Sequence, residues 1–200
     1  MQTTLSIRAV AGAICTAAAT LLAAPAQAAL QDRDLNHDSV VDAFYDTDLD
    51  ITWLRDANVN GTMQWTMAVT WADGYSLGGY SDWRLPTSDG CMLYNCTNSE
   101  MGHLWYVELG NSAGTLTNTG NFQNFEPGDY WSGTEYAPTP SEAWYFDTIG
   151  GYQLPDGKNL YFFAMAVRDG DVAVVPEPQT YALLALGLTG LLAVTRRRPR

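Results

Sequence analysis

The sequence predicts an α+β domain, and the order of its segments carries that prediction. Strand-like segments stand at 40–45 and 51–54, two amphipathic helix patterns follow them, and aromatic and β-branched runs fill the last third. Strands, then helices, then strands again is the grouped order of an α+β fold. We therefore expect one domain in which two helices pack on a mostly antiparallel sheet with long loops. The N-terminal and C-terminal strands should share that sheet.

The first elements form a predicted hairpin. Apolar residues at Val40, Val41 and Phe44 indicate one strand, and the Ile-Thr-Trp-Leu run at 51–54 indicates the next. The aspartate-rich segment 46–48 between them is turn-prone, because aspartate side chains accept hydrogen bonds from nearby backbone amides.

The first helix is predicted from Gln64 onward. Trp65, Ala68, Val69 and Ala72 follow the spacing i, i+3, i+4, i+7, which places them on one buried face. Gly74 is expected to end this helix.

The second helix has a predicted N-terminal signal at Thr97 and Glu100, which are spaced as a capping box. Apolar residues at Met101 and Leu104 continue the helical period, and Gly110 should end it.

The remaining segments are predicted to be strands and loops. Runs at 130–132, 143–146 and 160–167 are rich in aromatic and β-branched residues and are bounded by Gly, Pro and Asp. The last run is apolar at successive positions, so both of its faces should be buried. Segment 111–124 is rich in Asn, Thr and Gly and is expected to be a surface loop.

The N-terminus has the pattern of a secretory signal peptide. Arg8 precedes an apolar, alanine-rich stretch, and Ala26 and Ala28 supply the small residues of a cleavage site. We expect residues 1–28 to be removed after Ala28, which leaves a domain at 29–174.

The C-terminus, 175–200, has the pattern of a sorting signal. Pro176, Glu177 and Pro178 are followed by a 14-residue apolar run at 181–194, shorter than the roughly 20 residues that cross a bilayer comfortably. Arginines then follow the run, which should remain cytoplasmic and place the domain outside: Arg196, Arg197, Arg198 and Arg200.

This C-terminal segment resembles the PEP-CTERM sorting signal of Gram-negative bacteria that make extracellular polysaccharide. The resemblance implies transient membrane insertion and cutting near Pro176-Glu177-Pro178 by an exosortase-type membrane protease. It implies localisation in the cell envelope or extracellular matrix. An ordinary C-terminal membrane anchor is the alternative.

The trimmed domain is strongly acidic. Residues 29–174 hold 21 acidic and 5 basic residues, a net charge of −16. Nucleic-acid binding requires a basic surface, so nucleic acid is not expected as a partner. Cations, neutral glycans and basic partners fit this charge.

The two cysteines of the domain, Cys91 and Cys96, are predicted to form a disulfide, since export places them in an oxidising compartment. A redox pair usually has the tighter C-x-x-C spacing. Metal binding by two thiols is not supported by any neighbouring Cys or His pair.

An aspartate-rich stretch places oxygen ligands at alternating positions, as calcium loops do. The four ligand candidates are Asp34, Asn36, Asp38 and Asp42. Neither frame of the motif has the EF-hand glycine, and the final bidentate carboxylate is replaced by Ala43 or Tyr45. A solvated acidic hairpin is the alternative, and no other cofactor is expected.

Five ordered motifs carry a family resemblance. They are 45–58 (YDTDLDITWLRDAN), 78–87 (GGYSDWRLPT), 130–136 (YWSGTEY), 143–146 (AWYF) and 166–171 (AVRDGD). Together they resemble the bacterial domain family named after the C-terminal domain of the collagen-like adhesin Lcl. The Arg-Leu-Pro-Thr core also resembles the formylglycine-generating family, and the resemblance implies a C-type-lectin-like fold. No segment resembles the catalytic cysteine region of that second family, so no oxidase activity is implied.

A scaffold role is expected for the WRLPT motif. Trp83 should bury a large apolar surface, Arg84 should bind loop carbonyls or a carboxylate, and Pro86 should fix the following turn. Trp131, Trp144 and Arg168 should serve the scaffold in the same way.

The sequence favours a non-enzymatic exported protein. His37 and His103 are the only histidines, and no G-x-S-x-G motif occurs. We expect a loop surface near 121–136 to bind glycan or exopolysaccharide, with Trp131, Glu135 and Tyr136 as candidate contacts. A purely structural matrix protein and a secreted polysaccharide-acting hydrolase are the alternatives.

Overall fold

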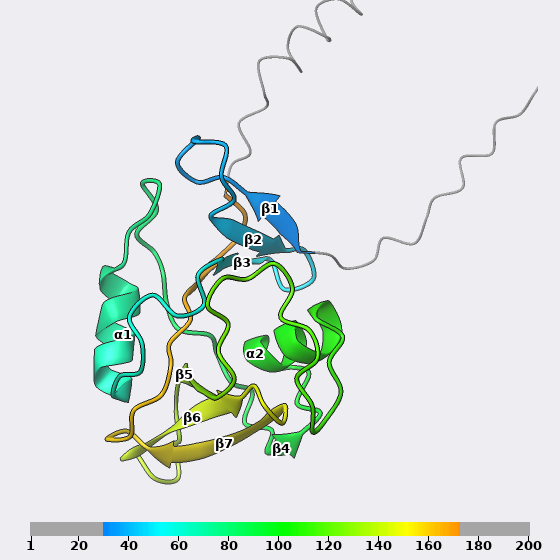
Figure 1. The fold of residues 1–200 in the computed structure, drawn as a ribbon. Helices are drawn as coiled ribbons and strands as arrows, with labels where there is room; N and C mark the ends of the chain where they lie inside the picture. The colour runs from blue at the N-terminus through cyan, green and yellow to red at the C-terminus, as the bar shows by residue number, and fades with distance from the viewer. Residues whose placement is uncertain (1–29, 173–200) are drawn as a thin grey trace, which may run out of the picture.

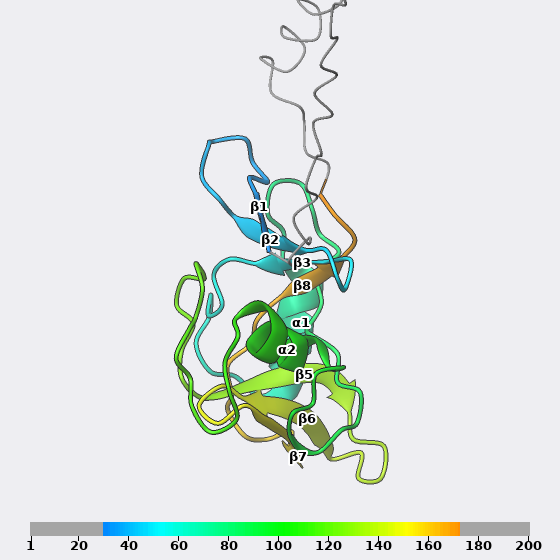
Figure 2. The ribbon, with the colours of Figure 1, turned by 90° about the vertical axis from the view of Figure 1, so that its right-hand side faces the viewer.

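A computed structural model describes residues 30–172, and its α+β class confirms the prediction. Figure 1 shows two groups of strands at opposite ends of the domain, with the helices between them, and Figure 2 shows the same layering after a quarter turn. The elements are β1 (Gln31–Arg33), β2 (Ala43–Asp46), β3 (Ile51–Leu54), α1 (Trp65–Gly74), β4 (Leu93–Tyr94), α2 (Glu100–His103), the π-helix η1 (Leu104–Glu108), β5 (Asp129–Glu135), β6 (Glu142–Asp147), β7 (Tyr152–Gly157) and β8 (Val167–Asp169).

The strands form two antiparallel sheets rather than the single sheet that the sequence predicted. The first has the order β1-β2-β3-β8 and the second the order β4-β7-β6-β5. In the first sheet, Trp53 of β3 pairs with Val167 of β8. The prediction that N-terminal and C-terminal strands lie in one sheet therefore holds for β8 alone, because β5 and β6 lie in the second sheet.

The segment 160–167 is not a continuous strand, which corrects the sequence prediction. It makes single bridges to three different neighbours, from Phe162 to Met63, from Phe163 to Tyr130 and from Val167 to Arg84. Its first residues are not buried on both faces either, because Tyr161 is 61% exposed. The segment crosses from one sheet to the other, and regular pairing begins only at β8.

The second helix begins later than predicted and changes its winding. Ser99, not Thr97, is the N-cap, and its hydroxyl accepts a hydrogen bond from the Gly102 amide at 3.1 Å. After one α-helical turn the chain continues as η1, where the Leu109 amide binds the Leu104 carbonyl at 2.9 Å. This i→i+5 bond defines a π-turn.

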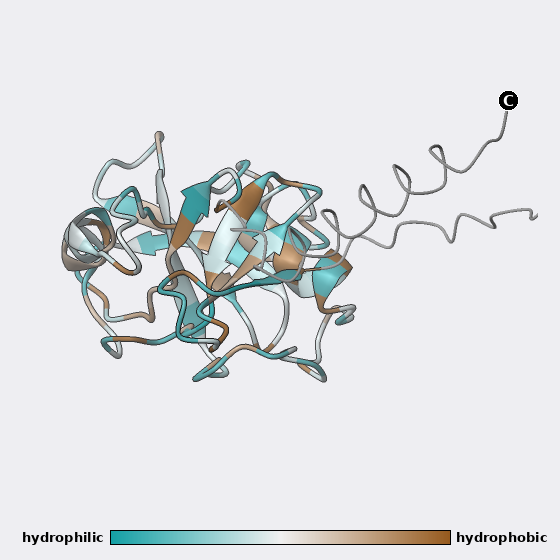
Figure 3. Ribbon diagram, turned by 90° about the horizontal axis from the view of Figure 1, so that it is seen from above, coloured by the Kyte–Doolittle hydropathy of each residue, from teal (hydrophilic) through white to brown (hydrophobic). Residues whose placement is uncertain are grey.

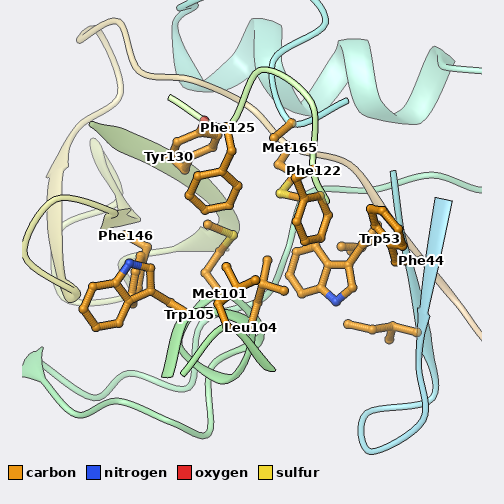
Figure 4. Packing of buried hydrophobic residues seen from close by; sticks show 14 residues of the cluster. Phe44, Trp53, Met101, Leu104, Trp105, Phe122, Phe125, Tyr130, Phe146 and Met165 are labelled. Atoms are coloured by element: carbon orange, nitrogen blue, oxygen red, sulfur yellow. The ribbon is translucent and has the colours of Figure 1, made fainter. Parts of the chain in front are cut away.

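One large apolar core joins the two sheets to α2 and η1. Figure 4 shows aromatic rings from both ends of the domain meeting around Met101 and Leu104. The indole N–H of buried Trp105 donates to the Thr148 carbonyl at 3.0 Å. This donor is therefore hydrogen-bonded although it lies in the core. Figure 3 shows hydrophilic residues along many outer loops, with apolar residues interspersed along the strands and α1.

Candidate functional site

The WRLPT motif ties three elements together. The Arg84 guanidinium makes a fork to the two Glu100 carboxylate oxygens at 2.8 Å each, and it also binds Asp169 and the Leu85 carbonyl. Hydrogen bonding to Glu100 raises the pKa of Arg84 further above its ordinary value. Trp83 is buried. These contacts give the motif the scaffold role that the sequence predicted.

Arg168 makes a second fork on β8. Its two donors bind the Asp82 carboxylate at 2.9 and 2.8 Å, and its guanidinium carbon lies over the Tyr80 ring, 4.8 Å from the ring centroid. Hydrogen bonding to Arg168 lowers the pKa of Asp82. The 78–87 motif is thereby held to the C-terminal strand at two separate points.

The three predicted glycan contacts do not form one exposed site. Trp131 is fully buried, and its indole N–H donates to the Met63 carbonyl at 2.8 Å, so its ring faces the core and cannot stack on a sugar. Glu135 is exposed and forms an ion pair with Lys158. Tyr136 is half-buried and packs edge-on against Trp144. The prediction that Trp131 is an aromatic contact for glycan is therefore wrong.

The predicted calcium ligands lie on one exposed loop before β2. Both Asp34 carboxylate oxygens accept backbone amides, including those of His37 at 2.7 Å and Ser39 at 2.8 Å. Desolvation acts against this, but the backbone hydrogen bonds lower the pKa of Asp34 overall. Asn36 and Asp38 accept amides of the same loop, and Asp42 accepts the Leu35 amide at 2.9 Å. Each of the four side chains is thus held by a hydrogen bond within the loop, and the three aspartates are not among the described acidic side chains whose ligand atoms converge.

A polar pocket of about 240 Å³ lies between the first sheet and the 121–123 segment. Its walls combine four polar side chains with three apolar ones: Asp32, Arg55, Asn121 and Gln123 with Val41, Phe44 and Phe122. The Phe44 and Phe122 rings meet edge to face, with centroids 4.8 Å apart, and form its apolar floor.

Backbone pairing holds this pocket in place. The Gln123 amide donates to the Arg55 carbonyl and the Ala57 amide donates to the Gln123 carbonyl, each at 2.9 Å. Arg55 also donates to the Val41 carbonyl at 2.9 Å. Among residues 30–172, the Asn121 and Gln123 side-chain amides and the Asp32 carboxylate make no hydrogen bond. These three side chains are exposed, so their donors and acceptors are open to solvent and to a ligand.

Sequence reasoning found only part of this pocket. It placed Asn121 at the edge of the predicted binding surface, but it did not single out Asp32, Arg55 or Gln123 as contacts. Arg55 lies inside the 45–58 motif, which was its one sequence signal. Asp32 and Gln123 are brought together only by the tertiary fold.

The Cys91–Cys96 disulfide is confirmed, with the Cα atoms 5.6 Å apart. It closes the loop that carries β4 at the edge of the second sheet. Ala26, Ala28, the Pro176-Glu177-Pro178 motif and the arginines at 196–198 lie outside the described residues, as does the apolar run 181–194. Within 30–172, no helix has the length and apolar character needed to cross a bilayer.

The fold and termini define the class of protein, an α+β domain with a C-terminal sorting segment. A family model described as the Lcl C-terminal domain matches residues 42–168, and one described as the PEP-CTERM protein-sorting motif matches residues 174–198. The chain belongs to the Lcl C-terminal domain family. Its sorting motif marks it as a protein processed by an exosortase and exported to the cell envelope or extracellular space. No curated protein matches the chain.

Proposed function

We propose that this chain is a non-enzymatic glycan-binding protein of the cell envelope or extracellular matrix. Its domain binds a neutral sugar unit of an exopolysaccharide in the pocket lined by Asp32, Arg55, Asn121 and Gln123 (here called the amide pocket). Residues 1–28 act as the signal peptide, and the domain has the C-type-lectin-like fold that the family resemblance implies. The source is a Gram-negative bacterium.

The observation that carries this proposal is the unused hydrogen-bonding capacity of the amide pocket. Sugar sites combine an apolar surface with a few convergent polar groups. Phe122 supplies the apolar floor, while the Asn121 and Gln123 amides can each donate to and accept from a hydroxyl. The pocket is smaller than the roughly 300–1,000 Å³ of typical small-molecule sites. Its size suits one sugar unit of a longer chain.

The lining residues favour binding over hydrolysis. A glycosidase ordinarily uses two carboxyl groups on either side of the scissile bond. Asp32 is the one carboxylate among the lining residues of this pocket. Neutral sugars are favoured over acidic ones, since the domain has a net charge of −16.

Binding of the full chain to the host's own exopolysaccharide tests the proposal. We expect the native protein to bind in a pull-down and on a glycan array, and the N121A/Q123A double variant to lose at least about tenfold in affinity. The matched control is N60A/N98A, which removes two exposed amides outside the pocket. Blank arrays and pull-downs with the native protein would favour the purely structural matrix role instead.

A further inference from the structure

A second polar cluster lies at the other end of β2, where the β2–β3 turn meets η1. The His103 Nε2 atom lies 3.4 Å from a Glu108 carboxylate oxygen, 4.0 Å from Asp46 Oδ2 and 3.9 Å from Asp48 Oδ2. The ligand atoms of Asp46, His103 and Glu108 all lie within 4.8 Å of one another. The imidazole therefore faces three carboxylates from two separate elements.

This cluster is buried, and two of its polar atoms are unsatisfied. The Asp46 side chain is completely buried, that of Glu108 is 2% exposed and that of His103 is 12% exposed. His103 Nε2 and Glu108 Oε1 have no hydrogen-bond partner among the described residues. Buried polar atoms are almost always paired, because an unpaired one costs about 1–3 kcal/mol. These two unpaired atoms lie 3.4 Å apart, a separation that a shared metal ion can bridge.

The π-helix is what puts His103 and Glu108 on the same side. Five residues along an α-helix correspond to a rotation of about 140° beyond a full turn, given 3.6 residues per turn. In the π-turn of η1, residues five apart are instead stacked one turn above the other. The wider winding thus brings Glu108 over His103, which a regular helix would not do.

The surrounding hydrogen bonds orient Asp46 for coordination. Its Oδ1 atom accepts the Asp48 and Leu49 amides at 3.0 Å each, which leaves Oδ2 toward His103. The Trp53 indole N–H lies 3.5 Å from the same Oδ2. Such outer contacts are the usual support of a metal ligand.

The charges of the cluster call for a cation. Three carboxylates surround one imidazole. An imidazole nitrogen among carboxylates suits zinc and related divalent transition ions, whereas calcium prefers oxygen ligands alone. Neighbouring ligand atoms of a tetrahedral zinc ion are about 3.4 Å apart, given bonds of roughly 2.0–2.2 Å. The distances from His103 Nε2 to the carboxylate oxygens, 3.4–4.0 Å, are close to this spacing, and the Asp46 and Glu108 oxygens lie within 4.8 Å of each other.

We propose that His103, Asp46 and Glu108 form a binding site for a divalent transition ion of the zinc type, with the more exposed Asp48 beside it. The ion links the β2–β3 turn to α2 and η1. It thereby fastens the first sheet to the helical layer. This site is independent of the amide pocket, and neither depends on the other.

Zinc content of the full chain tests the site. The chain is purified, stripped with a chelator, equilibrated with zinc chloride and passed through gel filtration before metal analysis. We expect one zinc per chain in the native protein and in H37Q, and less than a tenth of that in H103Q. H37Q is the matched control because it removes the only other histidine, which lies on the exposed loop. Zinc absent from the native chain, or retained by H103Q, overturns the proposal.

A second variant distinguishes lost coordination from lost folding. E108Q keeps the shape of the buried side chain and removes one ligand charge. We expect it to fold and to bind zinc at least tenfold more weakly. In the native chain, zinc at a hundredfold excess over Kd should raise the Tm by on the order of 5–10 °C. D34N should leave this shift unchanged, whereas loss of zinc in D34N alone would place the ion on the exposed loop and overturn the proposal.

Discussion

Two acidic regions stand at the two ends of strand β2 and differ in how their oxygen atoms are used. In the exposed loop 34–42, the carboxylates accept hydrogen bonds from amides a few residues away. In the buried cluster of Asp46, His103 and Glu108, the residues come from separate elements and two polar atoms are unsatisfied among the described residues. The loop can stand alone without a ligand, whereas the cluster is incomplete without one.

A local sequence pattern of acidic residues does not by itself make a metal-binding site. The loop has the contiguous spacing that a sequence motif detects, and its neighbouring amides satisfy it. The cluster has no motif, since 55 positions along the chain separate His103 from Asp48. Its chemistry comes from burial and from the π-turn.

The largest effect should come from releasing the helix that carries His103. Arg84 holds Glu100, the first residue of α2, through a bidentate ion pair. The R84A change leaves the Glu100 carboxylate without this partner, and its side chain is only 13% exposed. We expect a loss of roughly 3 kcal/mol in the free energy of unfolding, measured by urea denaturation. K158A, which removes a more exposed ion pair, should cost less than about 1 kcal/mol, and an equal loss in both variants would refute the distinction.

A pair of aspartates outside these two regions tests whether burial, rather than acidity alone, decides how an acidic group affects stability. Asp129 faces Asp147 across β5 and β6, and desolvation followed by the Asp147 charge raises the pKa of Asp129 to about 6. A raised carboxyl pKa stabilises the fold only while the group is protonated. Stability should therefore fall as the pH rises from about 4 to about 6, by roughly 1–2 kcal/mol for this half-buried group.

Denaturation curves across this pH range provide the measurement. D129N should remove that part of the decline and be more stable than the native chain at pH 7. The effect of Asp34 on stability has the opposite pH dependence, because the pKa of Asp34 is lowered. Its contribution to stability should therefore be lost as the pH falls. A D129N curve with the native pH dependence would contradict the assignment.

In zinc-free buffer, E108Q should make the fold more stable. The change removes a buried charge next to Asp46 and supplies an amide donor, and we expect a gain of about 1 kcal/mol in the free energy of unfolding. E126Q, at an exposed position, is the control and should change stability by less than about 0.5 kcal/mol. A destabilised E108Q would show that the Glu108 carboxylate already has a stabilising partner in the apo protein.

The smallest effect concerns calcium on the loop 34–42, which stays a prediction. Its oxygen ligands suit calcium, and extracellular sites of this kind bind in the millimolar range. At free calcium twice the Kd, we expect a stabilisation of roughly 0.6 kcal/mol. Calorimetry should show heat that D34N abolishes and E108Q leaves unchanged. Neither heat nor stabilisation in the native chain would rule the loop out as a calcium site.

Much of the fold could be predicted where local patterns agree with packing. The helix at α1 and the strands at β3, β5 and β6 were predicted because their apolar periods match the faces that they bury. The strand β7 was missed because it contains Pro155. That proline is tolerated since β4 pairs only with Gln153 and Tyr152, so β7 has no outer neighbour at Pro155.

The wrong predictions about site residues have a common cause. Each rested on a local sequence pattern, whereas the side chain is engaged by a tertiary partner. Glu100 fits a capping box in the sequence, but its carboxylate is taken by Arg84 and by the Thr87 amide. Trp131 is an aromatic residue of a kind that binds sugars, but its side chain is fully buried in the core. Neither outcome can be derived from spacing along the chain.

The pairing of β8 with β3 has a mechanical meaning for a protein whose sorting segment follows the domain. Any pull on that segment reaches the first sheet through the residues that follow β8. Just before it, Arg33 of β1 holds the Asp171 carboxylate at 2.6 and 2.9 Å. This clasp joins the first and last strands of the sheet. Tension from an attached C-terminus is therefore shared with the N-terminal strand instead of peeling β8 away alone.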